Sequence, residues 1–517
     1  MKQIVLQNFR NPSVGYSTNL HRLVSGFVPH YTDLASETSD TDFRDKVNPA
    51  YSLVLAPSMA ILDTQGTLRI VAITEKSGAV ITNSTTKVIY ATNLWDIYFE
   101  DPTEENFTTQ PTTVSGTSDG VDLEVFQGDI VTSFYSNAKI KYNGGATSTA
   151  WSDHTGADVS TAALKLFRKF KDGLMVSDVS YIRTLTSSFA LSALADSFRL
   201  VVANVIQEII DYNNFSDQYM VVFFENAFAG LANPAPLYDR TDWVLWNGLD
   251  TAVYEFHKTI RGKYRCCIVR DNTIYAFTQL GTTLICWQFT GFDFREYGRI
   301  KNVVVSTELS NPKMRVSLEN DFFVLMAHSP DNVSTESPFY WNPATGDNFF
   351  MVEQAQDGLA VLISQQSDGT YQRYISTINP STGTGSVLQK IVLESTGRHN
   401  TASYKSGVIA IPEGRGKINR VIVEYNEAPT TVSDRIDFTL STKDETEAES
   451  LTTNSAIIKD TTGNSTNANV SAKRAIMEFK PLCTELEISL SLTKTTASYW
   501  LIVRKIIIEY EPVMLKN

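Results

Sequence analysis

The sequence has no long hydrophobic run, little positive charge and few cysteines. No stretch approaches the 18 apolar residues that suggest a membrane-spanning helix, and the first residues, MKQIVLQNFRNPSVGY, turn polar after Leu6. That is too early for the apolar core of a secretory signal. We therefore expect a protein without a membrane segment that stays inside the producing cell.

The charge balance is acidic, with 44 Lys and Arg against 57 Asp and Glu and a formal net charge of −13. Surfaces that bind nucleic acid need clustered Lys and Arg, so this balance disfavours a nucleic-acid-binding role. The four cysteines form no CxxC pair and no disulfide-framework spacing, which suits a reducing compartment. We expect buried thiols at all four positions, Cys266, Cys267, Cys286 and Cys483.

Motifs that carry chemistry are also missing. The chain contains no GxxxxGK[ST] phosphate loop and no HExxH pair. SDGTY at 367–371 lacks the spacing of the Asp-box turns found in sialidase-type propellers, and DTDFRD at 40–45 lacks the glycine of a calcium loop. The histidines are scattered singly, at His21, His30, His154, His257, His328 and His399. The sequence predicts no enzyme and no catalytic, cofactor-binding or metal-binding residue.

What the sequence does have is a β-rich composition and many short strand-like runs. It contains 22 Tyr and 27 Phe, and only 20% of its residues are charged. Apolar runs bounded by turn residues predict strands at 52–56, 68–74, 87–92, 219–224, 264–269, 273–278, 283–289, 302–307, 322–328, 359–364 and 407–412. The pattern is typical of an all-β fold.

Similar turn-like segments precede several of these runs, which suggests a repeat. The segments are KDG at 171–173, RDN at 270–272, END at 319–321, QDG at 356–358 and KSG at 405–407. The last four follow one another at intervals of 50, 36 and 49 residues. Periods of about 40–50 residues with several strands each are typical of β-propeller blades. Stacked β-sandwiches would also give short strands and frequent turns, and they remain the alternative.

Two segments allow helices. Residues 187–212 place apolar side chains on one helical face, yet FRLVVANV within them fits a blade strand equally well. Residues 163–170, ALKLFRKF, favour a short helix. We therefore expect an all-β propeller with one or two inserted helices at most.

The end of the chain repeats itself. INRVIVEYNE at 418–427 and VRKIIIEYEP at 503–512 align without a gap, with an apolar face and one acid, Glu424 or Glu509, on the opposite face. We interpret them as equivalent strands of a small antiparallel sandwich. The predicted domains are a propeller at 1–417, with polar insertions near 36–45 and 104–120, and a C-terminal β-domain at 418–517 with an exposed excursion at 441–475.

This organisation resembles the propeller-type tail and neck proteins of tailed bacteriophages, especially the nozzle proteins of short-tailed phages. The features that carry the resemblance are the blade pattern, LYDRTDWVLWNG at 237–248, YWNPATGDNFF at 340–350 and the last strand, IIIEYEP. The resemblance implies a virion structural protein, assembled in the host cytoplasm as a homo-oligomeric ring with other tail proteins. DNA would pass through such a ring without specific binding.

Two other functions remain open at this stage. A propeller rim could bind a receptor or glycan, with aromatic side chains stacking on sugar; the candidates are Trp243, Trp246, Trp287 and Trp341. Core packing is the other role for these four side chains. A glycoside-processing propeller enzyme is the second alternative, and it would need paired carboxylates.

Overall fold

A computed structural model provides the fold. It describes residues 1–6, 24–25, 27–31, 51–55, 59–66, 70–76, 87–92, 96–99, 112–113, 120–135, 137–143, 151–161, 164–200, 205–214, 217–225, 239–248, 257–305, 311–328, 336–350, 358–365, 371–378, 385–391, 401–429, 431, 433–444, 450–495 and 501–513. Nearly all regular structure in these residues is β-strand. The helical segments among them are two short 3-10 turns, η1 (Leu194–Asp196) and η2 (Pro312–Arg315). None of the helices described is long and apolar enough to cross a membrane.

The chain divides into two compact units, and the all-β fold class is confirmed in both. One unit holds residues 60–336 and 355–390, and the other holds 1–59, 337–354 and 391–517. Because both ends of the chain enter the second unit, the division differs from the predicted boundary at 417/418.

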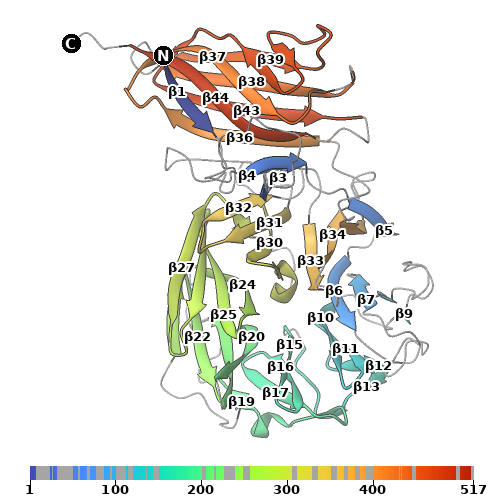
Figure 1. Ribbon diagram of the computed structural model, residues 1–517. Coiled ribbons are helices and arrows are strands. Elements are labelled where there is room, and N and C mark those ends of the chain that lie inside the picture. The colour runs from blue at the N-terminus through green and yellow to red at the C-terminus, as the bar shows by residue number, and fades with distance from the viewer. Residues whose placement is uncertain are drawn as a thin grey trace. The chain divides into compact units, whose positions relative to one another are not determined.

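The first unit is a β-propeller whose sheets follow one another in chain order and are antiparallel apart from one short parallel pair in blade 3 (Figure 1). Blade 1 holds β6 (Ile70–Lys76), β7 (Lys87–Thr92), β8 (Asp96–Phe99) and β9 (Thr112–Thr113), and blade 2 holds β10 (Gly120–Phe126), β11 (Asp129–Phe134), β12 (Lys141–Asn143) and β13 (Ser152–Asp153). Blade 3 holds β14 (Thr155–Gly156), β15 (Phe167–Phe170), β16 (Gly173–Asp178), β17 (Tyr181–Leu185), β18 (Ala190–Leu191) and β19 (Phe198–Arg199).

The remaining blades repeat this arrangement. Blade 4 holds β20 (Val205–Asn214), β21 (Asp217–Glu225), β22 (Arg240–Trp246) and β23 (His257–Arg261), and blade 5 holds β24 (Lys263–Arg270), β25 (Thr273–Leu280), β26 (Thr283–Phe289) and β27 (Phe294–Lys301). Blade 6 includes β28 (Val304–Val305), β29 (Val316–Glu319) and β30 (Phe322–His328). Blade 7 holds β33 (Gly358–Gln365), β34 (Tyr371–Ile378), β35 (Ser386–Ile391) and β5 (Met59–Gln65).

The ring closes on itself. The inner strands contact one another in the order β6, β10, β15, β20, β24, β29 and β33, and β33 returns to β6. The segment β5, which precedes blade 1 in the chain, forms the outer strand of blade 7 beside β35. The first and last blades are also joined by the Ser376 hydroxyl, which donates to the Ile70 carbonyl at 2.9 Å. Strands from both ends of the propeller sequence thus share one sheet.

Three of the five predicted turn segments mark equivalent positions. Lys171–Asp172, Asp271–Asn272 and Asn320–Asp321 lie between the first and second antiparallel strands of blades 3, 5 and 6. Asp271 and Asn272 both have positive φ, the conformation favoured in two-residue hairpins because its twist matches that of the strands.

Of the other two segments, one precedes a strand as expected and one does not. Gly358 begins the inner strand β33, so the strand expected after QDG is present, while Gln356 and Asp357 lie outside the described residues. KSG lies inside β36 (Thr401–Ala410), where the pairing register shifts between Lys405 and Val408. Glycine at a bulge and glycine at a turn give the same local sequence signal.

The helix predicted for 163–170 is wrong, because Phe167–Phe170 form β15. In the ambiguous segment 187–212, the described residues form strands β18, β19 and the start of β20, with η1 between β18 and β19. Regular blade pairing overrides the helical periodicity there, since β20 pairs with β21 along its whole length.

Apolar side chains between neighbouring blades form the propeller core. Blades 3 and 4 share one cluster, in which Trp246 packs on Phe198 with ring centroids 4.7 Å apart. Blades 4 and 5 share another, in which Trp243 meets Phe289 and Phe294 edge to face. A flat sheet buries its two faces only when it has neighbours on both sides, which explains the repetition.

The second unit contains two antiparallel sheets. The first sheet holds β1 (Lys2–Leu6), β3 (Phe27–Tyr31), β4 (Tyr51–Leu55), β37 (Gly416–Tyr425), β40 (Asn469–Ser471), β41 (Arg474–Met477), β42 (Leu482–Cys483) and β44 (Ile502–Pro512). The other sheet holds β2 (Val24–Ser25), β36, β38 (Arg435–Asp444), β39 (Ser450–Ile458) and β43 (Glu485–Thr493). This unit also includes the hairpin of β31 (Ser337–Asn342) and β32 (Asp347–Phe350).

The terminal repeat is confirmed as two strands of one sheet, and they are direct neighbours. β37 pairs with β44 antiparallel, with Val421 opposite Ile508 and Val423 opposite Ile506, and all four side chains are fully buried. Glu509 differs from the expected exposed acid, because it is only 4% exposed. The N-terminal strand β1 lies beside β44 (Figure 1). Gln3 of β1 donates to the Glu509 carboxylate at 2.9 Å.

The predicted exposed excursion at 441–475 is mostly regular structure. β38 continues to Asp444, and β39 pairs with it along its full length. Two alternate residues of β39, Ala456 and Ile458, are buried. The polar residues around them make this buried face difficult to recognise from the sequence. The polar insertion near 36–45 lies outside the described residues, as does the one at 104–120 except for β9 and Gly120.

Candidate functional site

Charged side chains gather at the centre of the propeller, on the inner strands of blades 2 to 4. Two of these inner strands contain a β-bulge next to an acidic residue. The bulge in β10 lies between Gly120 and Asp122, and the bulge in β20 lies between Ile206 and Glu208. A bulge redirects the side chains beside it. The inner strands β6, β24 and β33 carry matching bulges, but there the residue after the bulge is Ala72, Cys266 or Ala360.

Asp122 is the most heavily bonded carboxylate in this central cluster. It is fully buried and accepts hydrogen bonds from the backbone N–H groups of Leu123, at 2.8 Å, and Phe167, at 2.7 Å. The Asn311 amide donates to it at 2.8 Å, and the Lys313 Nζ lies 3.1 Å from its Oδ2. Both oxygens are therefore in use.

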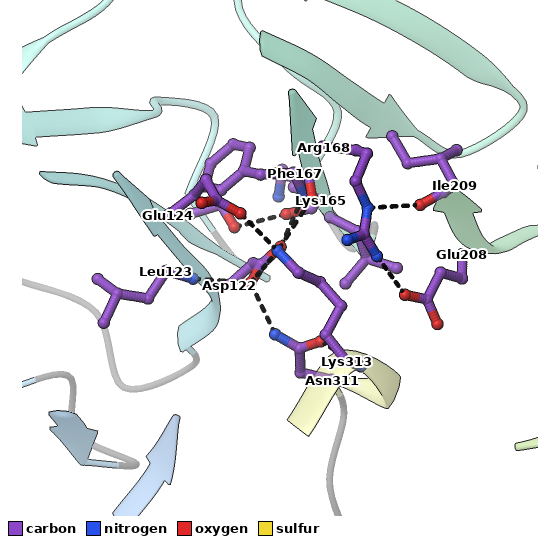
Figure 2. Close-up of polar contacts among 12 residues, drawn as sticks. Asp122, Leu123, Glu124, Lys165, Phe167, Arg168, Glu208, Ile209, Asn311 and Lys313 are labelled. Carbon is purple, nitrogen blue, oxygen red and sulfur yellow. Dashed lines mark hydrogen bonds and ion pairs between the residues drawn. The ribbon is translucent and has the colours of Figure 1, made fainter. Parts of the chain in front are cut away.

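Lys313 joins three blades. Its ammonium group lies 3.0 Å from the Glu124 carboxylate on β10 and donates to the Phe167 carbonyl on β15, also at 3.0 Å (Figure 2). Lys313 itself belongs to η2, directly before β29 of blade 6. Asn311 caps η2 by accepting from the Lys313 backbone N–H, and Pro312 follows at the first helical position. The turn thus places the Lys313 side chain across the ring, in contact with Asp122 and Glu124.

Glu208 forms the second half of the cluster. Its side chain is fully buried, and its carboxylate accepts from Arg168 of β15 at 2.9 Å and from the Tyr264 hydroxyl of β24 at 2.6 Å. Arg168 also donates to the Ile209 carbonyl at 3.1 Å, as Figure 2 shows. Blades 3, 4 and 5 meet through this one carboxylate.

The pKa values follow from burial and from the neighbouring charges. Burial would raise the pKa of Glu124, but Lys313 and Lys169 outweigh it and hold that pKa below its ordinary value. Burial would lower the pKa of Lys313, yet Asp122 and Glu124 raise it. For Glu208, burial dominates over Arg168 and raises the pKa. These ion pairs connect different blades. Each carboxylate oxygen of Asp122 and Glu208 accepts from at least one donor.

The residues singled out from the sequence lie elsewhere. Trp243, Trp246 and Trp341 are at most 7% exposed, and the partly buried Trp287 packs against the core between blades 4 and 5. All four side chains therefore contribute to core packing. All four cysteines are buried, as expected, and burial raises the pKa of each thiol.

Of the six histidines, His154 is buried, and its ring contacts the Ile140 and Ala157 carbonyls. Within the described residues no group of three His, Cys, Asp or Glu side chains is placed to hold a metal ion. The calcium-loop candidate at 40–45 lies outside those residues, and so does SDGTY except for Tyr371.

Sequence reasoning missed the central cluster. Asp122 and Lys313 are 191 residues apart, so no local motif connects them. One signal was available, because Asn311-Pro312 is a typical start of a helical turn and places Lys313 just inside it. Nothing in the sequence alone shows that this turn faces blade 2.

No protein-family model and no curated protein matches the sequence. Similar solved structures include virginiamycin B lyase from Staphylococcus aureus, at 7% identity, with 65% of this chain and 99% of that chain covered and a TM-score of 0.42. BBS1N in complex with ARL6DN has 7% identity, coverage of 66% and 99%, and a TM-score of 0.44. An exo-β-1,3-galactanase from Phanerochaete chrysosporium has 11% identity, coverage of 69% and 98%, and a TM-score of 0.30. At such identities a likeness concerns the fold alone, and the propeller assignment rests on the blades of this chain.

Proposed function

We propose that this chain is a structural component of a phage virion, a nozzle- or hub-type ring protein that forms part of the DNA exit channel. The observation that carries a structural role is the central cluster. An enzyme of the glycosidase type needs a carboxylic acid and a carboxylate free to exchange protons with a substrate. Here Asp122 and Glu208 accept hydrogen bonds from donors on other blades. These contacts favour a role in holding the blades rigidly together.

The propeller's own axis is a poor path for DNA. The turn η2 reaches from blade 6 to contact blades 2 and 3 through Lys313, which fills the centre of the ring with side chains. A duplex would have to pass along the axis of an oligomer, lined by one flank of each subunit. The net charge of −13 per chain suits such a wall, because it would repel phosphates rather than bind them.

An edge strand supports assembly with neighbouring copies. β39 is the last strand of its sheet in the described part of the chain, and Ser450–Ile458 contains no charged residue and no proline. Its outer edge is covered at the C-terminal end, where Ile457 forms a bridge with Thr466 and the Ser455 carbonyl accepts from Asn467. Natural edge strands are normally protected by charge, proline or a covering segment, since their free N–H and C=O groups pair with other chains. Leu451 in this strand is 72% exposed. A second copy of the chain is the partner that the proposal implies.

Mass photometry of the purified chain tests the proposal, with the expectation of a closed oligomer of one size. Thr453→Lys places a charge on β39 away from the Ile457–Thr466 bridge and should shift the protein to monomers. The matched control is Asn469→Lys on β40, an exposed edge position of the other sheet, which should leave the oligomer intact. A strictly monomeric wild-type chain that occurs singly in particles would refute the ring.

Genome ejection tests the conduit itself. Lysine substitutions at residues that line the oligomer axis should slow ejection without blocking particle assembly, because they add binding sites for phosphate. Unchanged ejection with several added lysines would contradict a channel role. Binding of the isolated protein to a glycan array would instead support the receptor-binding alternative, since a channel component has no reason to bind sugar.

A further inference from the structure

Two arginines of the propeller, Arg265 and Arg315, lie side by side near the central cluster. Arg265 is the extra residue in the bulge of β24, where the pairing register passes from Tyr264 to Cys266. Arg315 ends η2 and is 8% exposed. Its Nη1 donates to the Arg265 carbonyl at 3.0 Å, which fixes the two residues next to each other.

Arg265 is partly buried and lacks the carboxylate partner that Arg168 and Arg183 have. Arg168 pairs with Glu208, and Arg183 pairs with Asp178 at 3.1 Å. The Nη1 of Arg265 donates to the Tyr264 carbonyl at 3.1 Å. Its Nε is buried and has no hydrogen-bond partner among the described residues, and no carboxylate there forms an ion pair with it.

The electrostatics of the pair favour an added negative charge. Burial lowers the pKa of both arginines, and the charge of Arg315 lowers the pKa of Arg265 further. Two like charges held together out of water repel each other more strongly than they would in solution. Guanidinium groups present several N–H donors in a planar fork that matches the oxygens of a carboxylate or phosphate.

We propose that Arg265 and Arg315 form a binding site for a small oxyanion, a phosphate or a carboxylate, at the centre of the propeller between β24 and η2. The anion would accept from the Nε of Arg265 and compensate the adjacent positive charges. It would also link blade 5 to the turn that precedes β29. The site is separate from Asp122 and Glu208, whose oxygens are already bonded.

Thermal unfolding of the full-length chain tests this site. Sodium phosphate and sodium citrate are titrated separately at constant ionic strength, with sodium chloride as the reference salt. We expect at least one of the two to raise the unfolding midpoint in a saturable way that chloride does not reproduce, because a ligand that binds only the folded state stabilises it. The more effective anion identifies phosphate or carboxylate as the preferred group.

Variants assign the effect to the arginine pair. Arg265→Gln should weaken the apparent anion affinity at least tenfold, whereas Arg265→Lys, which keeps the charge but loses the fork, should weaken it less. Arg299→Gln is the control, because Arg299 is an exposed arginine on β27 that pairs with Glu296. The proposal fails if neither anion shifts the wild-type midpoint, or if the shift persists undiminished in both Arg265 variants. Using two variants keeps the test decisive if one of them does not fold.

Discussion

The two units of this molecule connect distant parts of the chain in different ways. In the two-sheet unit the connection is made by whole strands, because β1 and β4 from the N-terminal end both pair with β44 from the C-terminal end. In the propeller most strands pair with their neighbours in sequence, and the blades are joined across the ring by apolar clusters and by a few charged side chains. Lys313 is the clearest of these, since it contacts strands that lie more than 140 residues away.

This difference implies different sensitivities. A unit held by non-local strands fails when one central strand is lost, however many contacts remain elsewhere. A ring of local hairpins keeps its blades when one contact is lost, but its closure depends on the groups that cross between blades.

Removing β44 should unfold the two-sheet unit and leave the propeller folded. The strand lies between β37 and β4 and contributes Ile506, Ile508 and Tyr510 to the core, all at most 2% exposed. Burial of each such side chain is worth roughly 2 kcal/mol, and truncation after Thr493 loses all of them together with the strand pairing. Limited proteolysis with mapping of the fragments should show cleavage in 401–444 and protection of 120–300.

Truncation after Val513 is the matched control, because it removes only residues beyond β44. This shorter protein should resist protease as the full chain does. Equal protection of 401–444 after truncation at Thr493 would show that the two sheets do not depend on their C-terminal strand. The expectation that this unit fails when a central strand is lost would then be wrong.

Lys313→Met should be the most damaging single substitution in the central cluster. It leaves Asp122 and Glu124 without their shared cation, and stranding a buried charge costs about 3–5 kcal/mol of unfolding free energy. Lys169→Met is the control, since Lys169 is 58% exposed and lies 3.7 Å from the same Glu124. We expect that control to change stability by less than about 1 kcal/mol in urea denaturation.

The pH dependence of this loss has a definite sign. Lys313 and Lys169 hold the pKa of Glu124 below its ordinary value of 4.5, so the stabilisation is present above that value and disappears as the pH falls through the lowered pKa. The gap between wild type and Lys313→Met should therefore narrow in acid. A gap that stays constant from neutral pH into acid would show that Lys313 acts by packing alone.

The local part of the fold could be predicted from sequence far better than this cluster. All eleven expected strands overlap observed ones, and 87–92, 283–289 and 322–328 match their bounds residue for residue. Short apolar runs separated by turn residues indicate strands that pair with the next strand in sequence. Most propeller strands pair in this way. The joining of β1 and β4 to β44 could not be predicted, because alternating apolar residues show that a strand has a buried face and do not show which strand lies beside it.

The site could be predicted least, for a related reason. The residue after the inner-strand bulge is an acid in blades 2 and 4 but Ala or Cys in blades 1, 5 and 7, so no repeated motif draws attention to Asp122 or Glu208. Their charged partners, Lys313 and Arg168, come from η2 and from a different blade. Charge compensation between distant segments leaves no periodic trace in a single sequence.

Lys165 offers the smallest test, because it is a buried lysine whose contacts are uncharged. It is fully buried, and its Nζ donates to the carbonyls of Phe134, at 2.5 Å, and Tyr135, at 2.9 Å. Burial lowers the pKa of Lys165 from 10.5 to about 8, with Asp178 opposing the shift. Between these two values the unfolded chain binds a proton that the folded chain has released, so folding becomes more favourable as the pH rises from 8 to 10.5.

Comparison with Lys165→Met isolates this effect from other groups that titrate in alkali. Relative to that variant, the wild type should gain on the order of 3 kcal/mol of unfolding free energy over this range, measured as a shift in urea midpoint at each pH. Lys169→Met, at an exposed lysine of the following strand β15, is the control and should show no such gain. If Lys165→Met also gives a constant difference, the ammonium group keeps its ordinary pKa. The two backbone carbonyls would then stabilise the charge of Lys165 as fully as the carboxylates stabilise that of Lys313. The two buried lysines would not differ in this respect.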